Sequence, residues 1–340
     1  MKPDNSASRD KILLVMIGRL GDYILTTPFM DGLRKKYPAA VITLITSKKA
    51  ANLAKTSRSI DRVVIFSGWH DIPGTAKVFA AAMKRYDLAL DLNPAYSRTS
   101  LWLMSLTKAP ERITFEKKAP AGTYTSLIAH DLANDHFMDK YVSLAARLGF
   151  TPPENMRITL SEETLLEGER LFRGLALPAG SFTVAIHPGN FKKFESRWPE
   201  EKFVEFTKAL LTKAGFSVFY LPGLGEEKET EETILRFLPG VKHIPPKSAE
   251  VTAAILKNAS VLVCNNTGTL HLAAAAGVPT FSFNRPYTEK CWKPRGKGHF
   301  FVTSRSHKSC RDIAVGEALE AFTLAAKKLK TGRETEHPGS

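Results

Sequence analysis

The first segment of the sequence that could do chemistry is Gly18-Arg19-Leu20-Gly21-Asp22. It directly follows the apolar run Lys11–Ile17, and glycines there let the chain turn sharply from a strand into a helix and approach a ligand closely. Asp22 would project from the first helical turn into a cleft, where a carboxylate can serve as a general base. An Asp in this position is also a good helix cap, and both roles stay open. The segment is not a dinucleotide-binding fingerprint, because the G-x-G-x-x-G spacing is absent.

A second segment combines a turn with clustered positive charge. His187-Pro188-Gly189-Asn190 follows the apolar run Phe182–Ile186 and precedes a helix start at Trp198-Pro199. Three cations lie in between, and these are Lys192, Lys193 and Arg197. Backbone N–H groups, a helix N-terminus and basic side chains together suit a diphosphate. The alternative is that these cations belong to an ordinary solvated loop.

A third segment, Asn265–His271, lies between the apolar run Val261–Cys264 and an alanine-rich helix. Residues 267–269 would offer free N–H groups at the N-terminus of that helix, which again suits an anion. His271 falls in the first turn, where it is either part of the site or a structural histidine. The sequence therefore predicts a second element of an anion site here.

Strands and helices alternate along both halves of the chain. In the first half, apolar runs predict strands at Lys11–Ile17, Val41–Ile45, Val63–Phe66 and Leu88–Leu92. The second half repeats the pattern at Phe182–Ile186, Ser217–Leu221, Val261–Cys264 and Thr280–Phe283. This alternation predicts an α/β fold with two doubly wound parallel sheets. All three polar segments follow predicted strands, so they should lie at the carboxyl ends of the sheets, where ligands bind.

The chain of 340 residues is long enough for two domains of ordinary size. We predict an N-terminal domain over residues 1–155, a linker over 156–181 and a C-terminal domain over 182–340. The linker contains a charged helix at Glu162–Arg173. The last helix of the chain is a candidate for packing back on the N-terminal domain.

The composition is that of a globular protein, with 43% hydrophobic and 24% charged residues, which argues against disordered, fibrous and membrane-spanning classes. The formal net charge is +14. Residues 1–150 hold 22 Lys and Arg against 13 Asp and Glu, a net of +9. Such a surface favours a polyanionic partner or is simply solvated. No nucleic-acid-binding motif accompanies the charge.

The cysteines and the N-terminus indicate the compartment. Cys264, Cys291 and Cys310 are an odd number without close pairing, so we expect reduced thiols and neither a disulfide nor a zinc site. The apolar run Ile12–Ile17 is too short for a signal-peptide core. We therefore expect a cytoplasmic protein.

The order and spacing of these segments resemble glycosyltransferase family 9, the ADP-heptose:lipopolysaccharide heptosyltransferases, over roughly residues 11–328. KILLVMIGRLGDYILTTPFMDGLRKKYPAAVITLIT looks like the family's opening strand, Gly-Asp turn and helix. IHPGN followed by RWPEEKF looks like the start of its second domain, and NNTGTLHLAAAAGVPTFSFNRP looks like its nucleotide-sugar motif. Trp292, Pro294, Cys310 and the Asp312-Ile313 pair also follow in the expected places.

The resemblance implies a GT-B fold, in which two Rossmann-like domains face a central cleft. The N-terminal domain would take the acceptor, the lipopolysaccharide inner core on lipid A. The C-terminal domain would take the donor, ADP-heptose or another nucleotide sugar. The reaction would be a single inverting displacement with Asp22 as the general base. The resemblance implies no cofactor and no bound metal ion.

The resemblance also assigns residues to each site. The donor-binding residues would be His187, Gly189, Asn190, Lys192, Lys193, Arg197, Asn266, Thr267, Gly268, Thr269 and His271. The acceptor-binding residues would be Gly21, Arg98, Arg112, Lys117, Lys118 and His136. The basic residues among them would meet phosphorylated lipid A at an anionic membrane surface. We therefore expect a peripheral enzyme on the inner face of the inner membrane of a Gram-negative bacterium. The oligomeric state stays open.

Two positions depart from the family pattern. Ser196 stands where the family often has Lys, and Asn266 stands where it has the Asp that touches the donor. These departures leave two alternatives open. The chain could use a different donor sugar, or it could be a non-catalytic relative that binds lipopolysaccharide or a nucleotide sugar.

Overall fold

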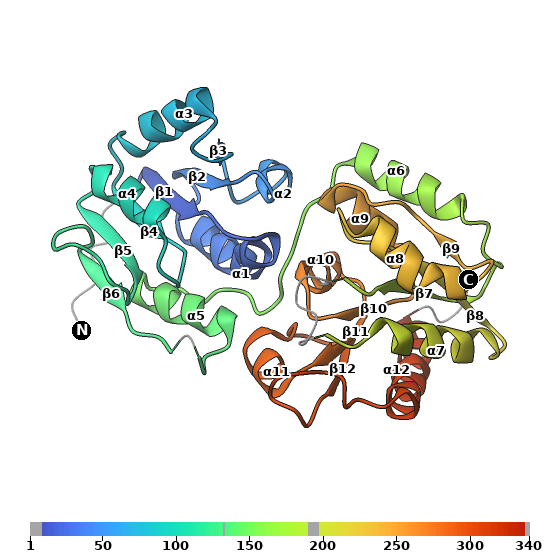
Figure 1. The fold of residues 1–340 in the computed structure, drawn as a ribbon. Coiled ribbons are helices and arrows are strands. Elements are labelled where there is room, and N and C mark those ends of the chain that lie inside the picture. The colour runs from blue at the N-terminus through green and yellow to red at the C-terminus, as the bar shows by residue number, and fades with distance from the viewer. Residues whose placement is uncertain (1–8, 132, 190–196, 337–340) are drawn as a thin grey trace. The chain divides into compact units, whose positions relative to one another are not determined.

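The computed structural model describes residues 9–131, 133–189 and 197–336. It divides into two compact units, Met1–Thr159 and Leu160–Ser340 (Figure 1). The division lies four residues beyond the end of our predicted N-terminal domain, and no separate linker stands between the units. Within the described residues, no helix is long and apolar enough to cross a membrane.

The first unit is built on a six-stranded parallel sheet with the order β3-β2-β1-β4-β5-β6. Its strands are β1 Lys11–Met16, β2 Val41–Ser47, β3 Arg62–Phe66, β4 Leu88–Asp91, β5 Glu111–Phe115 and β6 Ser126–Ile128. The central strands β1 and β4 are almost entirely buried. Strands covered on both faces read as continuous apolar runs, which is why the sequence predicted them.

Helices cover both faces of this sheet, and they are α1 Leu20–Lys36, α2 Ala51–Lys55, α3 Ile72–Ala82, α4 Arg98–Leu106 and α5 Phe137–Arg147. The buried sides of α3 and α4 share one core cluster with β1 and β4. Helix α1 packs against α5, where Phe29 meets Tyr141. Pro28 lies inside α1 and cannot donate to the carbonyl of Ile24, so the hydroxyl of Thr27 donates to that carbonyl at 2.7 Å.

The second unit repeats the same topology with the order β12-β11-β10-β7-β8-β9, again all parallel. Its strands are β7 Phe182–His187, β8 Phe216–Tyr220, β9 Lys242–His243, β10 Val261–Asn265, β11 Thr280–Asn284 and β12 His299–Thr303. Its helices are α6 Glu162–Arg173, α7 Glu200–Leu211, α8 Glu227–Thr233, α9 Ala249–Leu256, α10 Gly268–Ala275, α11 Pro286–Trp292 and α12 Val315–Glu336. A short 3-10 turn, Leu235–Phe237, follows α8. Both sheets thus have the Rossmann strand order, which confirms the predicted α/β fold.

The segment that we predicted as a linker is largely part of the second unit. Helix α6 packs on α9. A Cβ atom placed on Gly168 would lie 2.4 Å from the Cβ of Ala254, so the two helices meet at a glycine. The charged sequence of α6 suggested a solvated connector, but its few small and apolar residues suffice to bind it to α9.

The last helix also packs within its own unit. Ala318, Phe322, Ala325 and Ala326 of α12 are buried in the core cluster formed around β7 and α7. Phe322 contacts Phe206 with 5.4 Å between ring centroids. One face of α12 is therefore part of the core of the second unit, and the expectation that this helix also packs on the N-terminal domain stays a prediction.

Candidate active site

Each sheet has a switch point where the strand order reverses, between β1 and β4 in the first unit and between β7 and β10 in the second. Ligands of doubly wound folds bind outside the carboxyl ends of the strands at this point. The Gly18–Asp22 turn follows β1, and the two other polar segments follow β7 and β10. All three sequence-predicted segments therefore lie where this fold binds ligands.

In the first unit, Asp22 is the third residue of α1, which begins at Leu20 and has Arg19 as its N-cap. Its Oδ2 accepts a hydrogen bond from the backbone N–H of Arg19 at 2.9 Å. A Cβ atom on Gly18 would lie 3.0 Å from the same oxygen, so a glycine at this position leaves room for the carboxylate. Asp22 is therefore not the N-cap that the sequence left open but the N3 residue of a capping box with Arg19, and its catalytic role stays a prediction.

A buried ion pair lies at the carboxyl end of β4. Asp91 is fully buried, and its Oδ2 lies 2.8 Å from Nζ of Lys117 and accepts from the hydroxyl of Tyr124 at 2.7 Å. Lys117 also donates to the carbonyl of Asn93 at 2.6 Å. Lys117 was predicted to face the acceptor; its ammonium group neutralises a buried carboxylate of the same unit, and the acceptor role stays a prediction.

Tyr141 of α5 is under the electrostatic influence of both Asp22 and Asp91. Its hydroxyl donates to the carbonyl of Leu92 at 2.7 Å. Burial raises the pKa of Tyr141 well above its usual value, and the negative charges of Asp22 and Asp91 raise it further. Tyr141 therefore stays protonated and remains a hydrogen-bond donor to the carbonyl of Leu92. The sequence analysis missed Asp91 and Tyr141, since nothing in LALDL or KYVSL marks either as a site residue.

The other predicted acceptor residues have different surroundings. His136 opens α5, as expected, and its Nδ1 accepts from the backbone N–H of Met138 at 3.2 Å. Arg112 donates to the carbonyls of residues 109, 122 and 123, so its guanidinium holds a loop of its own unit. Gly21 is buried in the first turn of α1, while Arg98 and Lys118 are exposed.

In the second unit, the structure joins two of the predicted segments. Nδ1 of His187 lies 2.7 Å from the carbonyl of Leu221, and Nε2 lies 3.1 Å from the hydroxyl of Thr269. Because a carbonyl only accepts, Nδ1 carries the proton and Nε2 accepts from Thr269. Burial lowers the pKa of His187, so the imidazole is neutral. A neutral His here orients the Thr269 hydroxyl and adds no charge.

Gly189 is required by this arrangement. Its φ is +28°, and a Cβ atom there would lie 2.4 Å from Nε2 of His187. The predicted donor residues Asn190, Lys192 and Lys193, and the departure at Ser196, lie outside the described residues.

Helix α10 begins at the third predicted segment. Thr267 is its N-cap and makes no side-chain cap, so the first backbone N–H groups of the helix stay available to a ligand. The hydroxyl of Thr267 is buried and has no hydrogen-bond partner among the described residues. His271 is buried inside the helix, whereas Gly268 and Thr269 are partly exposed. This turn has the geometry that suits an anion.

Two adjacent asparagines fix the shape of this site. Oδ1 of Asn265 accepts from the backbone N–H of Trp198 at 2.7 Å, and its Nδ2 donates to the carbonyl of Pro188 at 2.7 Å. Asn265 thus holds the end of β7 and the start of the α7 region together, a role that the sequence analysis missed. Asn266 donates to Oδ1 of Asn284 at 2.8 Å.

Arg197 differs from its predicted role. The sequence suggested a forked contact with a diphosphate, but the side chain is buried and forms an ion pair with Glu200 at the start of α7. Its charge is therefore already balanced within the unit. Cys264 packs in the core as expected, and burial raises the pKa of its thiol.

The sequence profile of "Glycosyltransferase family 9 (heptosyltransferase)" matches residues 79–316, which is more than half of the chain. The chain belongs to this family. The match includes the whole second-unit site, while the Gly-Asp turn precedes it. The family identifies the chain as a glycosyltransferase.

Individual relatives are similar to this chain over most of its length. Lipopolysaccharide heptosyltransferase 1 of Escherichia coli K12 is 21% identical over 289 residues, covering 81% of this chain and 88% of the relative. The corresponding protein of Pseudomonas aeruginosa is 23% identical over 290 residues, covering 81% and 79%.

Among solved structures, a family 9 glycosyltransferase from Veillonella parvula superposes with a TM-score of 0.81 at 19% identity, covering 96% of this chain and 100% of that one. E. coli ADP-heptose lps heptosyltransferase II gives 0.76 at 18% identity, covering 94% and 99%. These structures confirm the GT-B fold.

Proposed function

We propose that this enzyme transfers a heptose, or a related sugar, from a nucleoside-diphosphate donor to the inner core of lipopolysaccharide. The Thr267–Thr269 turn beside the neutral His187 carries this proposal, because it is a preformed anion site at a Rossmann switch point. The sugar and the acceptor are those of similar proteins, lipopolysaccharide heptosyltransferase 1 and an E. coli heptosyltransferase solved with ADP.

The donor diphosphate would lie at the N-terminus of α10. The N–H groups of Gly268 and Thr269 can donate to phosphate oxygens, and so can the hydroxyl of Thr267, which has no partner in the described part of the chain. Negative charge grows on the diphosphate as it leaves, and donors fixed in advance stabilise this charge without reorganising. We assign no metal ion or cofactor to the reaction.

Asp22 would act as the general base of an inverting displacement. Its carboxylate would take the proton of the acceptor hydroxyl while that oxygen bonds to the anomeric carbon and the bond to the diphosphate breaks. The carboxylate is held in one orientation by the Arg19 N–H, which keeps it positioned for proton transfer. Tyr141 stays a neutral donor beside it, so it does not compete for the proton.

One observation favours a second candidate donor. Asn266 replaces the family's acidic residue and pairs with Asn284, so a neutral amide stands where a carboxylate would face the sugar. A donor sugar other than heptose is consistent with an asparagine at position 266. A non-catalytic binding protein is the remaining alternative and predicts ligand binding without transfer.

The proposal is tested by incubating the purified chain with ADP-heptose and a lipid A-linked inner-core acceptor. We expect a product one heptose heavier than the acceptor, with inverted anomeric configuration by NMR. Thermal shifts with a panel of nucleoside diphosphates and sugar nucleotides would identify the donor, because a ligand that binds only the native state raises its stability. Binding without transfer of any sugar would favour the non-catalytic alternative. The proposed location is the inner face of a Gram-negative inner membrane.

A further inference from the structure

The outer surface of α3 is apolar, although it faces solvent. Its exposed residues are Ile72, Pro73, Ala76, Lys77 and Ala80, and only Lys77 is polar. Met83 at the end of the helix is 52% exposed and extends the stripe. A helix face in contact with water normally carries polar side chains. The apolar composition therefore indicates that this face binds a partner and is not left in contact with water.

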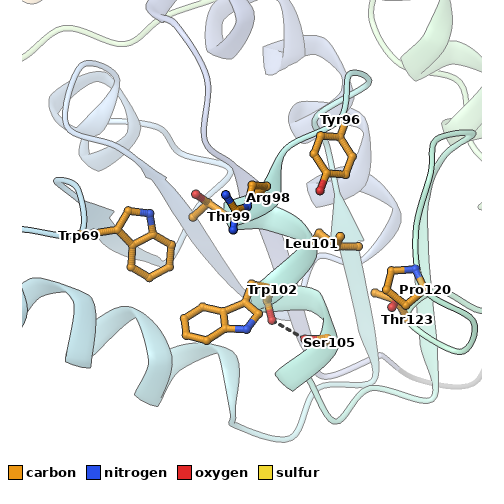
Figure 2. Close-up of a pocket in the computed structure, with 9 residues that line it drawn as sticks. All are labelled: Trp69, Tyr96, Arg98, Thr99, Leu101, Trp102, Ser105, Pro120 and Thr123. Atoms are coloured by element: carbon orange, nitrogen blue, oxygen red, sulfur yellow. Dashed lines mark hydrogen bonds between the residues drawn. The ribbon is translucent and has the colours of Figure 1, made fainter.

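Two half-exposed tryptophans lie beside this stripe. Trp69 is 50% exposed and Trp102 of α4 is 51% exposed, with 5.3 Å between their ring centroids (Figure 2). Phe79 of α3 supports Trp102 edge-on at 4.8 Å. We call the combined face of Trp69, Trp102 and the α3 stripe the α3–α4 surface. Packing holds its aromatic rings in place, so these side chains need not become ordered when they insert into a partner.

A cavity of about 780 Å³ opens next to the tryptophans. Tyr96, Arg98 and Trp102 line it together with Pro120 and Thr123 from a second segment (Figure 2). Tyr96 is 57% exposed. The cavity thus combines aromatic walls with one cation, a combination that accepts an anionic headgroup.

Charge on this part of the chain is one-sided. Between Trp69 and Lys108 all five basic residues are exposed, namely Lys77, Lys84, Arg85, Arg98 and Lys108. The three acidic residues are each engaged: Asp71 caps α3, Asp87 binds the backbone of Lys11, and Asp91 pairs with Lys117. Of the five basic residues, Lys77 belongs to the α3 stripe and Arg98 lines the cavity, so the α3–α4 surface itself carries two exposed cations and complements a negatively charged partner.

We propose that the α3–α4 surface docks on a bilayer that contains anionic phospholipids. Trp and Tyr prefer the level of the headgroups, the apolar stripe suits the upper acyl region, and each basic residue near an anionic surface adds attraction. This inference rests on the proposed function in one respect: docking on a bilayer brings the enzyme to an acceptor that is linked to a lipid. A second copy of the chain fits less well, since a symmetric contact would place two surfaces that both carry Lys77 and Arg98 against each other.

The test is co-sedimentation of the full chain with vesicles of phosphatidylcholine alone or with added phosphatidylglycerol. We expect binding only with phosphatidylglycerol. Ile72→Glu and Lys77→Glu should each weaken vesicle binding by about tenfold or more. A basic residue near an anionic surface contributes about 1 kcal/mol, or about fivefold in affinity, and the new Glu is repelled by that surface in both variants. Leu324→Glu and Lys328→Glu on α12 introduce the same changes at exposed positions and should bind as the parent does.

Tryptophan fluorescence and transfer activity distinguish the possible outcomes of this test. Brominated acyl chains should quench the tryptophan emission of the bound protein, and Trp69→Phe with Trp102→Phe should abolish that quenching. Transfer to a soluble, deacylated acceptor should be unchanged in Ile72→Glu, so this result and the vesicle result can fail independently. Equal binding by Ile72→Glu and Leu324→Glu would overturn the inference. A solution dimer that Ile72→Glu dissociates would overturn it as well, in favour of a second copy of the chain.

Discussion

The hydroxyl of Thr269 donates a hydrogen bond to the imidazole of His187, with 3.1 Å between Oγ1 and Nε2. This bond joins the end of β7 to the first turn of α10, across the switch point of the second sheet. Leu221 fixes the other imidazole nitrogen. The anion site is therefore built by three strand ends, and its geometry depends on the orientation of one buried ring.

Gly189→Ala should disturb that ring. Its positive φ costs an L-residue about 1–2 kcal/mol, and the new Cβ would push His187 aside. We expect ADP affinity to fall about tenfold, or about 1.4 kcal/mol by calorimetry. Gly215→Ala is the matched control, because Gly215 also has a positive φ but its Cβ would meet nothing within 4 Å. Equal ADP affinity in both variants would show that the His187 contact is irrelevant.

Stability should fall in mild acid because of buried neutral histidines. Burial lowers the pKa of His299 to about 4, and it also lowers that of His187. Protons then bind the unfolded chain below its pKa of about 6.5 before they bind the folded one, so stability falls as pH falls through that window. For His299 the loss at about pH 5 is about 2 kcal/mol.

Urea unfolding of His299→Gln at about pH 5 and pH 7.5 measures this contribution. The variant should lose less stability between the two pH values than the parent does. His243→Gln, at an exposed histidine, is the control and should follow the parent. A pH dependence of His299→Gln identical to that of the parent would contradict the assignment.

Lys117→Met should destabilise the first unit. Removing one partner of a buried ion pair leaves Asp91 uncompensated and costs about 3–5 kcal/mol. Lys118→Met changes the neighbouring exposed lysine and should cost less than about 0.5 kcal/mol. Denaturant unfolding of both variants is the measurement. If Lys117→Met unfolds like the parent but loses acceptor affinity, the residue has the acceptor role that the sequence suggested.

Asn266→Asp tests the donor choice. The variant restores the family's carboxylate and replaces the amide that donates to Asn284. If Asn266 selects the sugar, the variant should gain activity with ADP-heptose relative to the native donor. Competition between the two donors in one reaction measures this ratio. An unaltered ratio would show that the position does not select the sugar.

The sequence predicted the fold well where burial is strong. The core strands β1, β2, β4, β7, β8, β10 and β11 are apolar runs, and the polar segments after them were correctly placed at the strand ends. Strands β5, β6, β9 and β12 were missed. β6 and β9 have only three and two residues and carry no pattern, while β5 and β12 are partly exposed and mix polar with apolar residues. Helix α6 was assigned to a linker, since its contact with α9 depends on one glycine.

The individual cations could not be assigned from the sequence. Lys117, Arg112 and Arg197 were all predicted to meet ligands, yet they bind Asp91, backbone carbonyls and Glu200. A sequence shows that a charge exists but not which partner folding brings to it. The same limit explains why Asn265 was missed, since its clamp joins positions 67 and 77 residues away.

The most direct test of the central claim is the transfer rate of Asp22→Asn with donor and acceptor saturating. The amide keeps the size of the side chain and can still accept from the Arg19 N–H, but it cannot take a proton. We predict that kcat falls by ~10²–10⁴ while ADP affinity stays unchanged. Asp71→Asn, at another helix cap, should keep full activity. Retention of more than about half of the parent kcat by Asp22→Asn would contradict the account and leave Asp22 as a cap alone.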